Sequence, residues 1–168
     1  EMCANGIRAF FKYLRDRHRI ENEEIRVETL SGVVRPRWMG ANQVRVDMGR
    51  PILSPAKIPT RLGSDEGPVL NVPLEIEGTE CLVSCVSMGN PHAVIEVADV
   101  DRAPVTQQGP AIENHVAFPN RVNVEFIHIL DRSHIRQRTW ERGTGETLAC
   151  GSGACAAAVA CHRLGRID

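Results

Sequence analysis

The chain has 168 residues, of which 42% are hydrophobic and 24% charged, and its net charge is −1 at pH 7. This length allows one ordinary domain or two small ones with a real buried core. The balanced charge argues against a nucleic-acid-binding face, and no apolar run approaches the roughly 20 residues needed to cross a bilayer. We therefore expect a globular protein whose partners include neither nucleic acid nor a membrane.

The six cysteines are too few and too unevenly spaced for a disulfide scaffold. Disulfide-rich chains are typical of oxidising compartments, so this pattern favours a reduced, cytoplasmic setting.

The first part of the chain carries one helix pattern and two strand patterns. In residues 5–20, apolar side chains recur at i, i+3, i+4 and i+7, beginning at Ile7, which predicts an amphipathic helix. Residues 24–30 and 42–49 alternate between apolar and polar side chains, as half-buried strands do.

Residues 49–68 contain four prolines and are interpreted as a linker between two units. We place the boundary so that the first unit comprises residues 1–60 and the second comprises residues 61–168.

The second unit is predicted to be rich in strands. The strand patterns lie at residues 69–76, 81–87, 92–98, 121–130 and 133–141. Residues 99–120 read as loop with one short helix, and the last two strands read as a hairpin that turns near residues 131–133. A glycine-containing loop at residues 142–147 leads into a helix at residues 150–164, which we expect to be buried because it is apolar nearly all round.

Two short segments share a pattern: MCANGIRAF at the start of the chain and ACGSGACAA near its end. In each, a cysteine (Cys3 or Cys150) stands at a predicted helix start. A small residue, then Asn or Ser, then Gly follow it. One copy falls in each proposed unit, which indicates two related halves.

A cysteine in this position has a definite chemistry. The unpaired N–H groups and partial positive charge of a helix start lower the pKa of a thiol and can also hold a carboxylate. Two such cysteines on opposite sides of a carbon acid could invert its configuration. One sulfur would remove a proton from one face, and the other would return a proton to the opposite face.

The remaining cysteines have simpler interpretations. As free buried cysteines often do, they are expected to pack as small hydrophobic residues: Cys81, Cys85, Cys155 and Cys161. A zinc site built from Cys150, Cys155, Cys161 and His162 is the alternative. However, the spacing on one helix does not bring the three sulfurs together, so no metal is expected.

Four segments resemble the diaminopimelate epimerases: MCANGIRAF, VSMGNPHAV, RVNVEF and ERGTGETLACGSGACAA. This family is cofactor-independent and acts in lysine and cell-wall biosynthesis. The resemblance covers only the middle of the family's usual length, so we expect a fragment that lacks the family's N-terminal and C-terminal portions. One departure is that Ala4 replaces the second residue of the family's C-G-N-G motif, where its methyl group would crowd the backbone N–H that meets the substrate.

The resemblance implies an α/β (α+β) fold of two pseudo-symmetric units. Each would be a curved, mainly antiparallel sheet around a central helix, with the active site in the cleft between them. Residues 1–60 would be the C-terminal part of the first epimerase domain, and residues 61–168 the second domain without its closing strands. The implied reaction converts LL-2,6-diaminopimelate to the meso form without a cofactor, which suits a chain with only two lysines. Family members are often dimeric, so a homodimer is also an expected assembly.

The resemblance also implies catalytic roles. Cys3 and Cys150 correspond to the two bases. His92 and Glu141 correspond to residues that assist proton handling beside the sulfurs.

The other implied roles concern substrate binding. Donors to the reacting carboxylate would come from Ala4, Asn5, Gly151 and Ser152. Asn90 and Asn123 would hydrogen-bond the substrate, while Glu141 and Arg142 would hold its charged groups.

The residues themselves leave room for other interpretations. Arg142 precedes a glycine-rich loop and could clamp a carboxylate with two hydrogen bonds. Asn90 precedes a proline, so it also suits a turn. Asn123 lies in a predicted strand, where Asn is disfavoured, and that local misfit favours a functional role.

Two other functions remain open. A related two-cysteine proline or hydroxyproline racemase would not need to hold a distal ammonium and carboxylate, so the ERGTGET and GNPHAV segments argue against it. A non-catalytic amino-acid-binding fragment is compatible with Ala4 and with the partial length.

Overall fold

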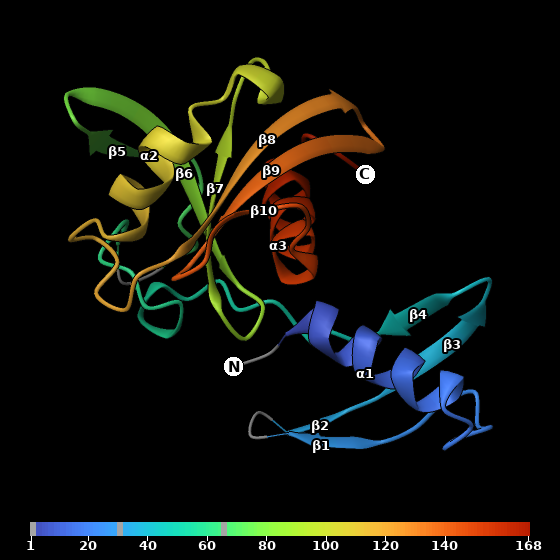
Figure 1. Ribbon diagram of the computed structural model, residues 1–168. Helices are drawn as coiled ribbons and strands as arrows, with labels where there is room; N and C mark the ends of the chain where they lie inside the picture. Colours follow the sequence, from blue (N-terminus) through green and yellow to red (C-terminus); the bar gives the residue numbers. More distant parts are fainter. Residues whose placement is uncertain (1–2, 30–31, 65–66) are drawn as a thin grey trace. The chain divides into compact units, whose positions relative to one another are not determined.

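The structure is a computed structural model that describes residues 3–29, 32–64 and 67–168. The chain divides into two compact units, Glu1–Arg50 and Pro51–Asp168, which are described separately (Figure 1). Helices and strands are mixed in the α+β manner that the sequence predicts. None of the helices in the described ranges is both long and apolar enough to span a bilayer.

The first unit has one helix and two small antiparallel sheets, β1 with β2 and β3 with β4. Its elements are α1 (Ala4–Asp16), β1 (Val27–Thr29), β2 (Gly32–Val34), β3 (Pro36–Gly40) and β4 (Gln43–Val46). The predicted helix and both predicted strands are present, although residue 30 lies outside the described residues. The sequence did not predict β2 and β3, because Gly32 and Pro36 interrupt the alternation of apolar and polar side chains.

The helix α1 packs on β3 through an aromatic contact. Phe11 is fully buried and stacks on Trp38, with 6.5 Å between the ring centroids. The guanidinium of Arg15 lies 4.9 Å from the centroid of the same indole ring. The helix is four residues shorter than predicted at its C-terminal end, where His18 adopts a left-handed backbone with φ of 51°.

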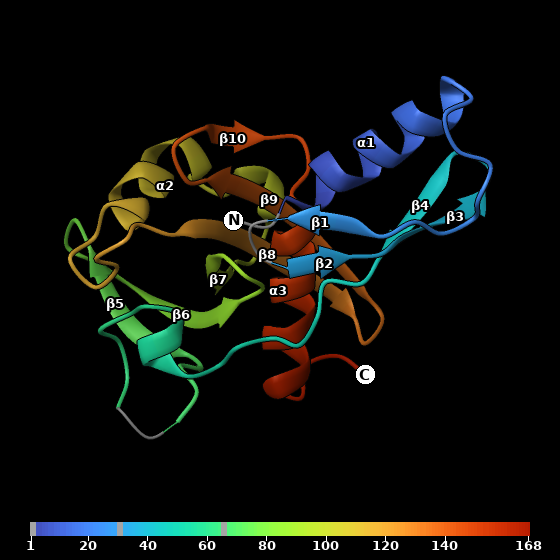
Figure 2. The same ribbon diagram turned by 90° about the horizontal axis from the view of Figure 1, so that it is seen from below.

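The second unit is built on a six-stranded sheet with the order β10-β9-β8-β7-β6-β5 (Figures 1 and 2). Its strands are β5 (Val72–Ile76), β6 (Thr79–Ser87), β7 (Pro91–Glu96), β8 (Asn123–Asp131), β9 (His134–Glu141) and β10 (Gly145–Thr147). All neighbouring strands are antiparallel except β7 and β8. Parallel neighbours require a crossover, which here contains η2 (Val100–Arg102) and α2 (Val105–Glu113).

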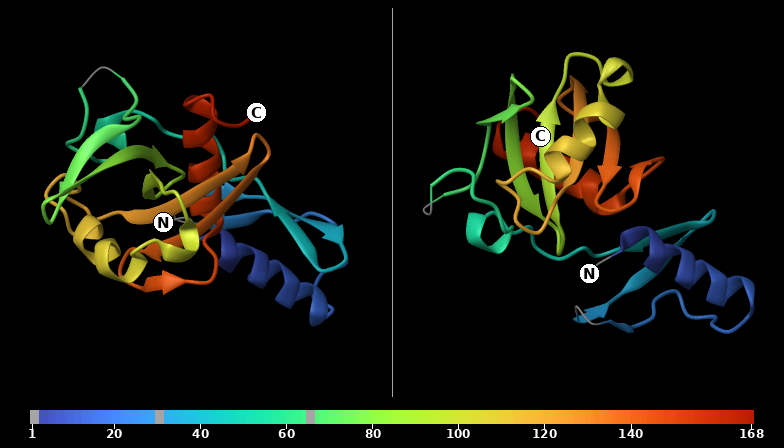
Figure 3. Two further views of the ribbon diagram at one scale, coloured as in Figure 1. Left: turned by 90° about the horizontal axis from the view of Figure 1, so that it is seen from above. Right: turned by 60° about the vertical axis from the view of Figure 1, so that its left-hand side comes forward.

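The two faces of this sheet have different characters because side chains alternate along each strand. On one face, Val124 and Phe126 of β8 join an apolar core that includes Ile112 of α2. On the other face, Glu125 lies against the start of α3 (Gly151–Arg163). Figure 3 shows α2 and α3 on opposite sides of the sheet. The sheet therefore separates an apolar core from a layer that contains polar side chains.

Most sequence predictions for this unit are confirmed. All five predicted strands, the turn near residues 131–133, the short helix within 99–120 and the helix near 150–164 are present. The prediction missed β10, which lies inside the expected loop. Cys85 is buried in the apolar core and Cys81 packs against it, as predicted for small hydrophobic side chains.

The prediction that α3 is buried all round is wrong for the part of the chain described here. Its buried residues lie along one stripe, for example Ala156 and Ala160, while Ala154 and Ala158 are exposed. Because its side chains are small, the helix is apolar on every side, yet only one side is buried against other elements.

The proline-rich segment packs on the second unit instead of linking two units. Ile52 and Ser87 exchange backbone hydrogen bonds of 2.8 and 2.9 Å. Ile58 follows η1 (Pro55–Lys57) and is 1% exposed within the core. The division between the units therefore falls after Arg50 rather than after residue 60.

Candidate active site

The two cysteines singled out by the sequence cap their helices in the same way. Cys150 has φ −125° and ψ 111°, and its sulfur accepts a hydrogen bond from the N–H of Gly153 at 3.4 Å. Cys3 has φ −122° and ψ 97°, and its sulfur accepts from the N–H of Gly6 at 3.3 Å. Each cysteine precedes a helix of 13 residues. The predicted position of both cysteines at helix starts is confirmed.

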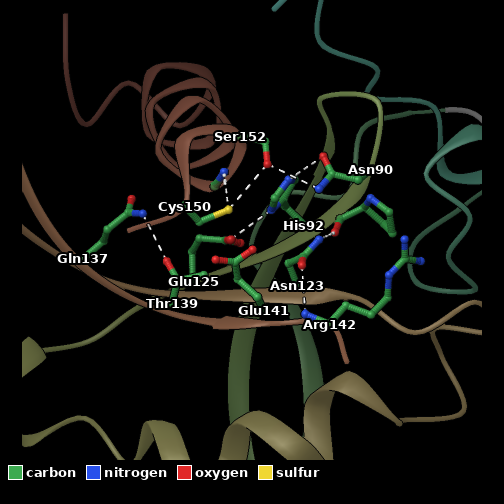
Figure 4. A network of polar contacts seen from close by, with 12 residues as sticks. Asn90, His92, Asn123, Glu125, Gln137, Thr139, Glu141, Arg142, Cys150 and Ser152 are labelled. Carbon is green, nitrogen blue, oxygen red and sulfur yellow. Dashed lines mark hydrogen bonds and ion pairs between the residues drawn. The ribbon is translucent and has the colours of Figure 1, made fainter. Parts of the chain in front are cut away.

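A chain of polar contacts leads from Cys150 into the protein interior (Figure 4). The Sγ atom of Cys150 lies 3.5 Å from Ser152 Oγ. Asn90 donates to the same oxygen from Nδ2 at 3.3 Å. Its other amide atom, Oδ1, lies 3.0 Å from His92 Nε2. His92 Nδ1 lies 2.9 Å from Glu125 Oε1. The chain thus joins α3, the turn before β7, and strands β7 and β8.

The inner end of this chain is completely buried. The side chains of His92 and Glu125 are both 0% exposed. The second carboxylate oxygen, Glu125 Oε2, has no hydrogen-bond partner among the described residues. Sequence reasoning missed Glu125. The available signal was a lone acidic residue inside the apolar strand of residues 121–130, because a buried carboxylate needs a specific partner.

Asn123 connects two parts of the site. It is buried, and its Nδ2 donates to the carbonyl oxygen of Pro91 at 2.9 Å. Its Oδ1 accepts from the backbone N–H of Arg142 at 2.9 Å. The Arg142 guanidinium in turn donates to the carbonyl oxygen of Asn120 at 2.7 Å. Asn123 therefore fixes the turn after β9 relative to β7.

Glu141 ends β9 beside this turn, and its Oε1 accepts from the hydroxyl of Thr147 on β10 at 2.5 Å. Figure 4 shows its carboxylate on the same side of the sheet as Cys150 and Glu125. This position allows it to affect the ionisation of the sulfur.

A second acidic residue that the sequence did not reveal supports the turn from the opposite face. Glu113, at the end of α2, is 5% exposed. Its Oε2 accepts from Trp140 Nε1 at 2.7 Å, and its Oε1 accepts from the N–H of Gly143 at 2.9 Å. Arg121 pairs with the same carboxylate at 3.2 Å. The Arg142 turn is therefore held from both faces of the sheet.

Burial raises the pKa of the Cys150 thiol, and the carboxylates of Glu125 and Glu141 raise it further. Hydrogen bonds from Ser152 and from the Gly153 N–H act in the opposite direction. The prediction that the helix start lowers the pKa is therefore wrong for Cys150. The reason is that desolvation disfavours the thiolate more than the capping donors favour it.

The structure brings together the predicted site residues of the second unit. These are Asn90, His92, Asn123, Glu141, Arg142, Cys150, Gly151 and Ser152.

The other predicted site residues lie at the start of α1 in the first unit. There Ala4 is buried, and Asn5 accepts a hydrogen bond from Arg8 through Oδ1. Cys3 is exposed.

The helix that carries Cys150 forms no metal site in this structure. Among the described residues, no three His, Cys, Asp or Glu side chains are grouped closely enough to hold a metal ion.

Comparisons with known proteins agree with the sequence motifs. Residues 84–168 match the family described as "Diaminopimelate epimerase". The chain is 51% identical to a diaminopimelate epimerase of Moorella thermoacetica, over 99% of this chain and 60% of that protein. It is 48% identical to diaminopimelate epimerase 1 of Nostoc sp., over 100% of this chain and 61% of that protein. The chain therefore spans about 60% of the length of these relatives.

The fold has a solved counterpart. The crystal structure of a phenazine biosynthesis protein of the PhzF family from Bacillus anthracis matches with a TM-score of 0.61. The match covers 95% of this chain and 56% of that one at 16% sequence identity, so it describes the fold alone.

Proposed function

Because the chain belongs to the diaminopimelate epimerase family, we propose that the protein converts LL-2,6-diaminopimelate to the meso form with Cys3 and Cys150 as two bases. The observation that carries the proposal is the matched capping of the two helices, since each sulfur lies at a helix start, where backbone N–H groups are suited to a carboxylate.

The raised pKa of Cys150 assigns the starting roles. Cys150 begins as the thiol that donates a proton, and in this direction Cys3 serves as the base. The Cys3 sulfur takes the proton from the α-carbon, and the electron pair left behind delocalises into the substrate carboxylate. Cys150 then gives its proton to the opposite face of that carbon and becomes the thiolate. The N–H groups at the helix starts stabilise the charge that develops on the carboxylate, so the reaction needs no cofactor.

The remaining residues bind and orient the substrate. Ala4 and Asn5 from one helix start, with Gly151 and Ser152 from the other, donate to the reacting carboxylate. His92 and Glu141 assist proton handling near the sulfurs.

The far end of the substrate carries a second carboxylate and a second ammonium group. Arg142 clamps the carboxylate and Glu141 accepts from the ammonium group, while Asn90 and Asn123 complete the hydrogen bonds. The ordered turn after β9 supports this arrangement, because it holds Glu141 and Arg142 beside the other polar residues.

We further propose that the whole protein consists of two pseudo-symmetric epimerase domains with the site in the cleft between them. It would act in the cytoplasm, in lysine and peptidoglycan precursor synthesis, as a homodimer. The chain would then supply part of the first domain and most of the second.

The proposal is tested by incubating the protein with LL-2,6-diaminopimelate in D2O. We expect deuterium at one α-carbon together with formation of the meso isomer. Exchange with proline or hydroxyproline, and none with diaminopimelate, would instead assign a racemase. Saturable binding of diaminopimelate by calorimetry, without any deuterium in the recovered ligand, would assign a binding protein and contradict the proposed reaction.

A further inference from the structure

The carboxylate of Glu125 is an acidic group close to Cys150 that the proposed reaction does not use. It lies on β8, fully buried, and touches His92 at the ring nitrogen that points away from Asn90. A buried carboxylate loses its hydration, so it is retained only where another group compensates it. His92 supplies that partner.

The position of the proton on the His92 ring decides how its two contacts work as hydrogen bonds. His92 Nδ1 lies 2.9 Å from Glu125 Oε1, and the carboxylate oxygen accepts a hydrogen bond when Nδ1 carries the proton. The state of the second nitrogen, Nε2, depends on which atom of the Asn90 amide faces it. Nε2 faces Asn90, and the hydrogen-bond chain continues from Asn90 to Ser152 and Cys150.

The Asn90 amide can face the His92 ring with either its oxygen or its nitrogen, and these two orientations are the two settings of the hydrogen-bond chain. With Oδ1 toward the ring, Nε2 is protonated, Nδ2 donates to Ser152, and the Ser152 hydroxyl can donate to a thiolate at Cys150. With the amide turned over, Nε2 accepts, the Ser152 hydroxyl donates to Asn90, and Ser152 Oγ can accept from the Cys150 thiol. The two settings suit the two protonation states through which Cys150 must pass.

We propose that Glu125 is a positioning residue of this site, whose carboxylate holds the Nδ1 proton of His92 so that Nε2 serves the hydrogen-bond chain through Asn90 and Ser152 to Cys150. The catalytic consequence rests on the proposed function, whereas the arrangement of protons does not. Without this carboxylate, the proton on a neutral ring can move to Nε2, which fixes the chain in one setting.

The first turn of α3 is shaped to admit the carboxylate. A methyl group on Gly153 would overlap Glu125 Oε1 and would lie 3.1 Å from its carboxyl carbon. A glycine at this position therefore lets the helix start approach Glu125 directly.

Among the residues that the structure describes, few charged groups lie near Cys150. The titratable groups that face it from the packed strands are His92 on β7, Glu125 on β8 and Glu141 on β9. The charged side chains of α3 itself lie in its last turn.

The test measures the ¹⁵N NMR signals of the His92 imidazole in the protein without substrate, so it requires no catalytic turnover. In the wild type we expect the neutral ring to carry its proton at Nδ1. Glu125→Leu removes the acceptor and keeps an apolar interior, so we expect the neutral ring to change to the form with Nε2 protonated and Nδ1 bare.

Glu141→Leu is the matched control. It also removes a carboxylate near Cys150 but leaves the Glu125 acceptor in place, so the neutral ring should keep its proton on Nδ1, as in the wild type. A wild-type spectrum with bare Nδ1 would overturn the proposal, and this result can be obtained even if Glu125→Leu does not fold. An unchanged spectrum in folded Glu125→Leu would overturn it equally.

A kinetic measurement separates the positioning role from the reaction itself. If the protein epimerises diaminopimelate, Glu125→Leu should lower kcat by about ten- to a hundredfold, as loss of a partner that orients a functional histidine does. KM should change little, because Glu125 does not touch substrate. If the wild type exchanges no proton with solvent, the proposed reaction is wrong, but the NMR result still stands. If kcat is unchanged in Glu125→Leu, Glu125 has no role in catalysis.

Discussion

Two opposing influences act on the thiol of Cys150. The Gly153 N–H and the Ser152 hydroxyl favour the thiolate, while burial and two carboxylates favour the thiol. The balance leaves the pKa above its ordinary value, so the residue rests protonated at neutral pH. In a two-base reaction this is useful, because one of the two sulfurs must begin as the proton donor.

Removing a neighbouring charge should therefore change the ionisation of Cys150. Glu141→Gln keeps the shape of the side chain and removes one of the two carboxylates that raise the pKa. We expect the pH profile of iodoacetamide labelling at Cys150, located by tandem mass spectrometry, to move to lower pH. Glu146→Gln is the control, since that carboxylate pairs with Arg138 instead. Equal profiles for wild type and Glu141→Gln would contradict this account.

At this scale the sequence predicts residues with local signatures and misses those whose partners are distant in the chain. Cys3 and Cys150 could be found because the residues that cap with them follow within three positions. The partner of Glu125 could not be found in this way, because His92 is 33 residues away and becomes a neighbour only when β7 and β8 pair.

At the scale of elements, the periodic patterns predicted which segments become helices and strands, but not which face of each element is buried. The strand β10 has only three residues and depends on its pairing with β9. No local sequence pattern predicts this pairing. The helix α2 illustrates the same limit, because its position depends on a close contact. Gly109 faces the indole of Trp140, and a methyl group there would lie 2.6 Å from Cγ of that ring.

This contact predicts an unusual effect of a helix substitution. Replacing Gly by Ala inside a helix is normally favourable by about 1 kcal/mol. In α2 we expect Gly109→Ala to lower the free energy of unfolding by roughly 1–3 kcal/mol, because overpacking forces α2 and Trp140 apart. Urea denaturation measures the change. Thr106→Ala, at an exposed position of the same helix, should change the stability by less than about 0.5 kcal/mol. A stabilised Gly109→Ala protein would show that the indole has room to move.

At the scale of the whole molecule, the second unit carries the larger core, and one of its members is a thiol. Cys85 is 0% exposed, and burial raises its pKa to about 12, opposed by a hydrogen bond with Thr60. Because the folded pKa is raised, the stability that the protonated thiol contributes is complete below the unfolded pKa. It is lost progressively as the pH rises from about 9 toward 12.

The linkage can be measured by urea unfolding at pH 8 and pH 10. Ionisation of Cys85 in the unfolded chain should remove about 1.4 kcal/mol of stability between these two pH values. Cys85→Val keeps an apolar side chain and eliminates this titration, so its loss over the same interval should be smaller by that amount. An identical pH dependence in the two proteins would mean that the thiol ionises as readily in the core as in the unfolded chain.

The most direct test of the central claim measures inversion when each sulfur is removed in turn. The conversion of LL-2,6-diaminopimelate to the meso form in D2O is followed by ¹H NMR for wild type, Cys3→Ala, Cys150→Ala and Cys155→Ala. The account predicts that Cys3→Ala and Cys150→Ala each slow inversion by a factor on the order of 10²–10⁴, since each removes the only group acting on one face of the carbon. Cys155→Ala should stay within about twofold of wild type, as expected for a position outside the reacting groups. Inversion at close to the wild-type rate in either Cys3→Ala or Cys150→Ala would contradict the two-cysteine mechanism.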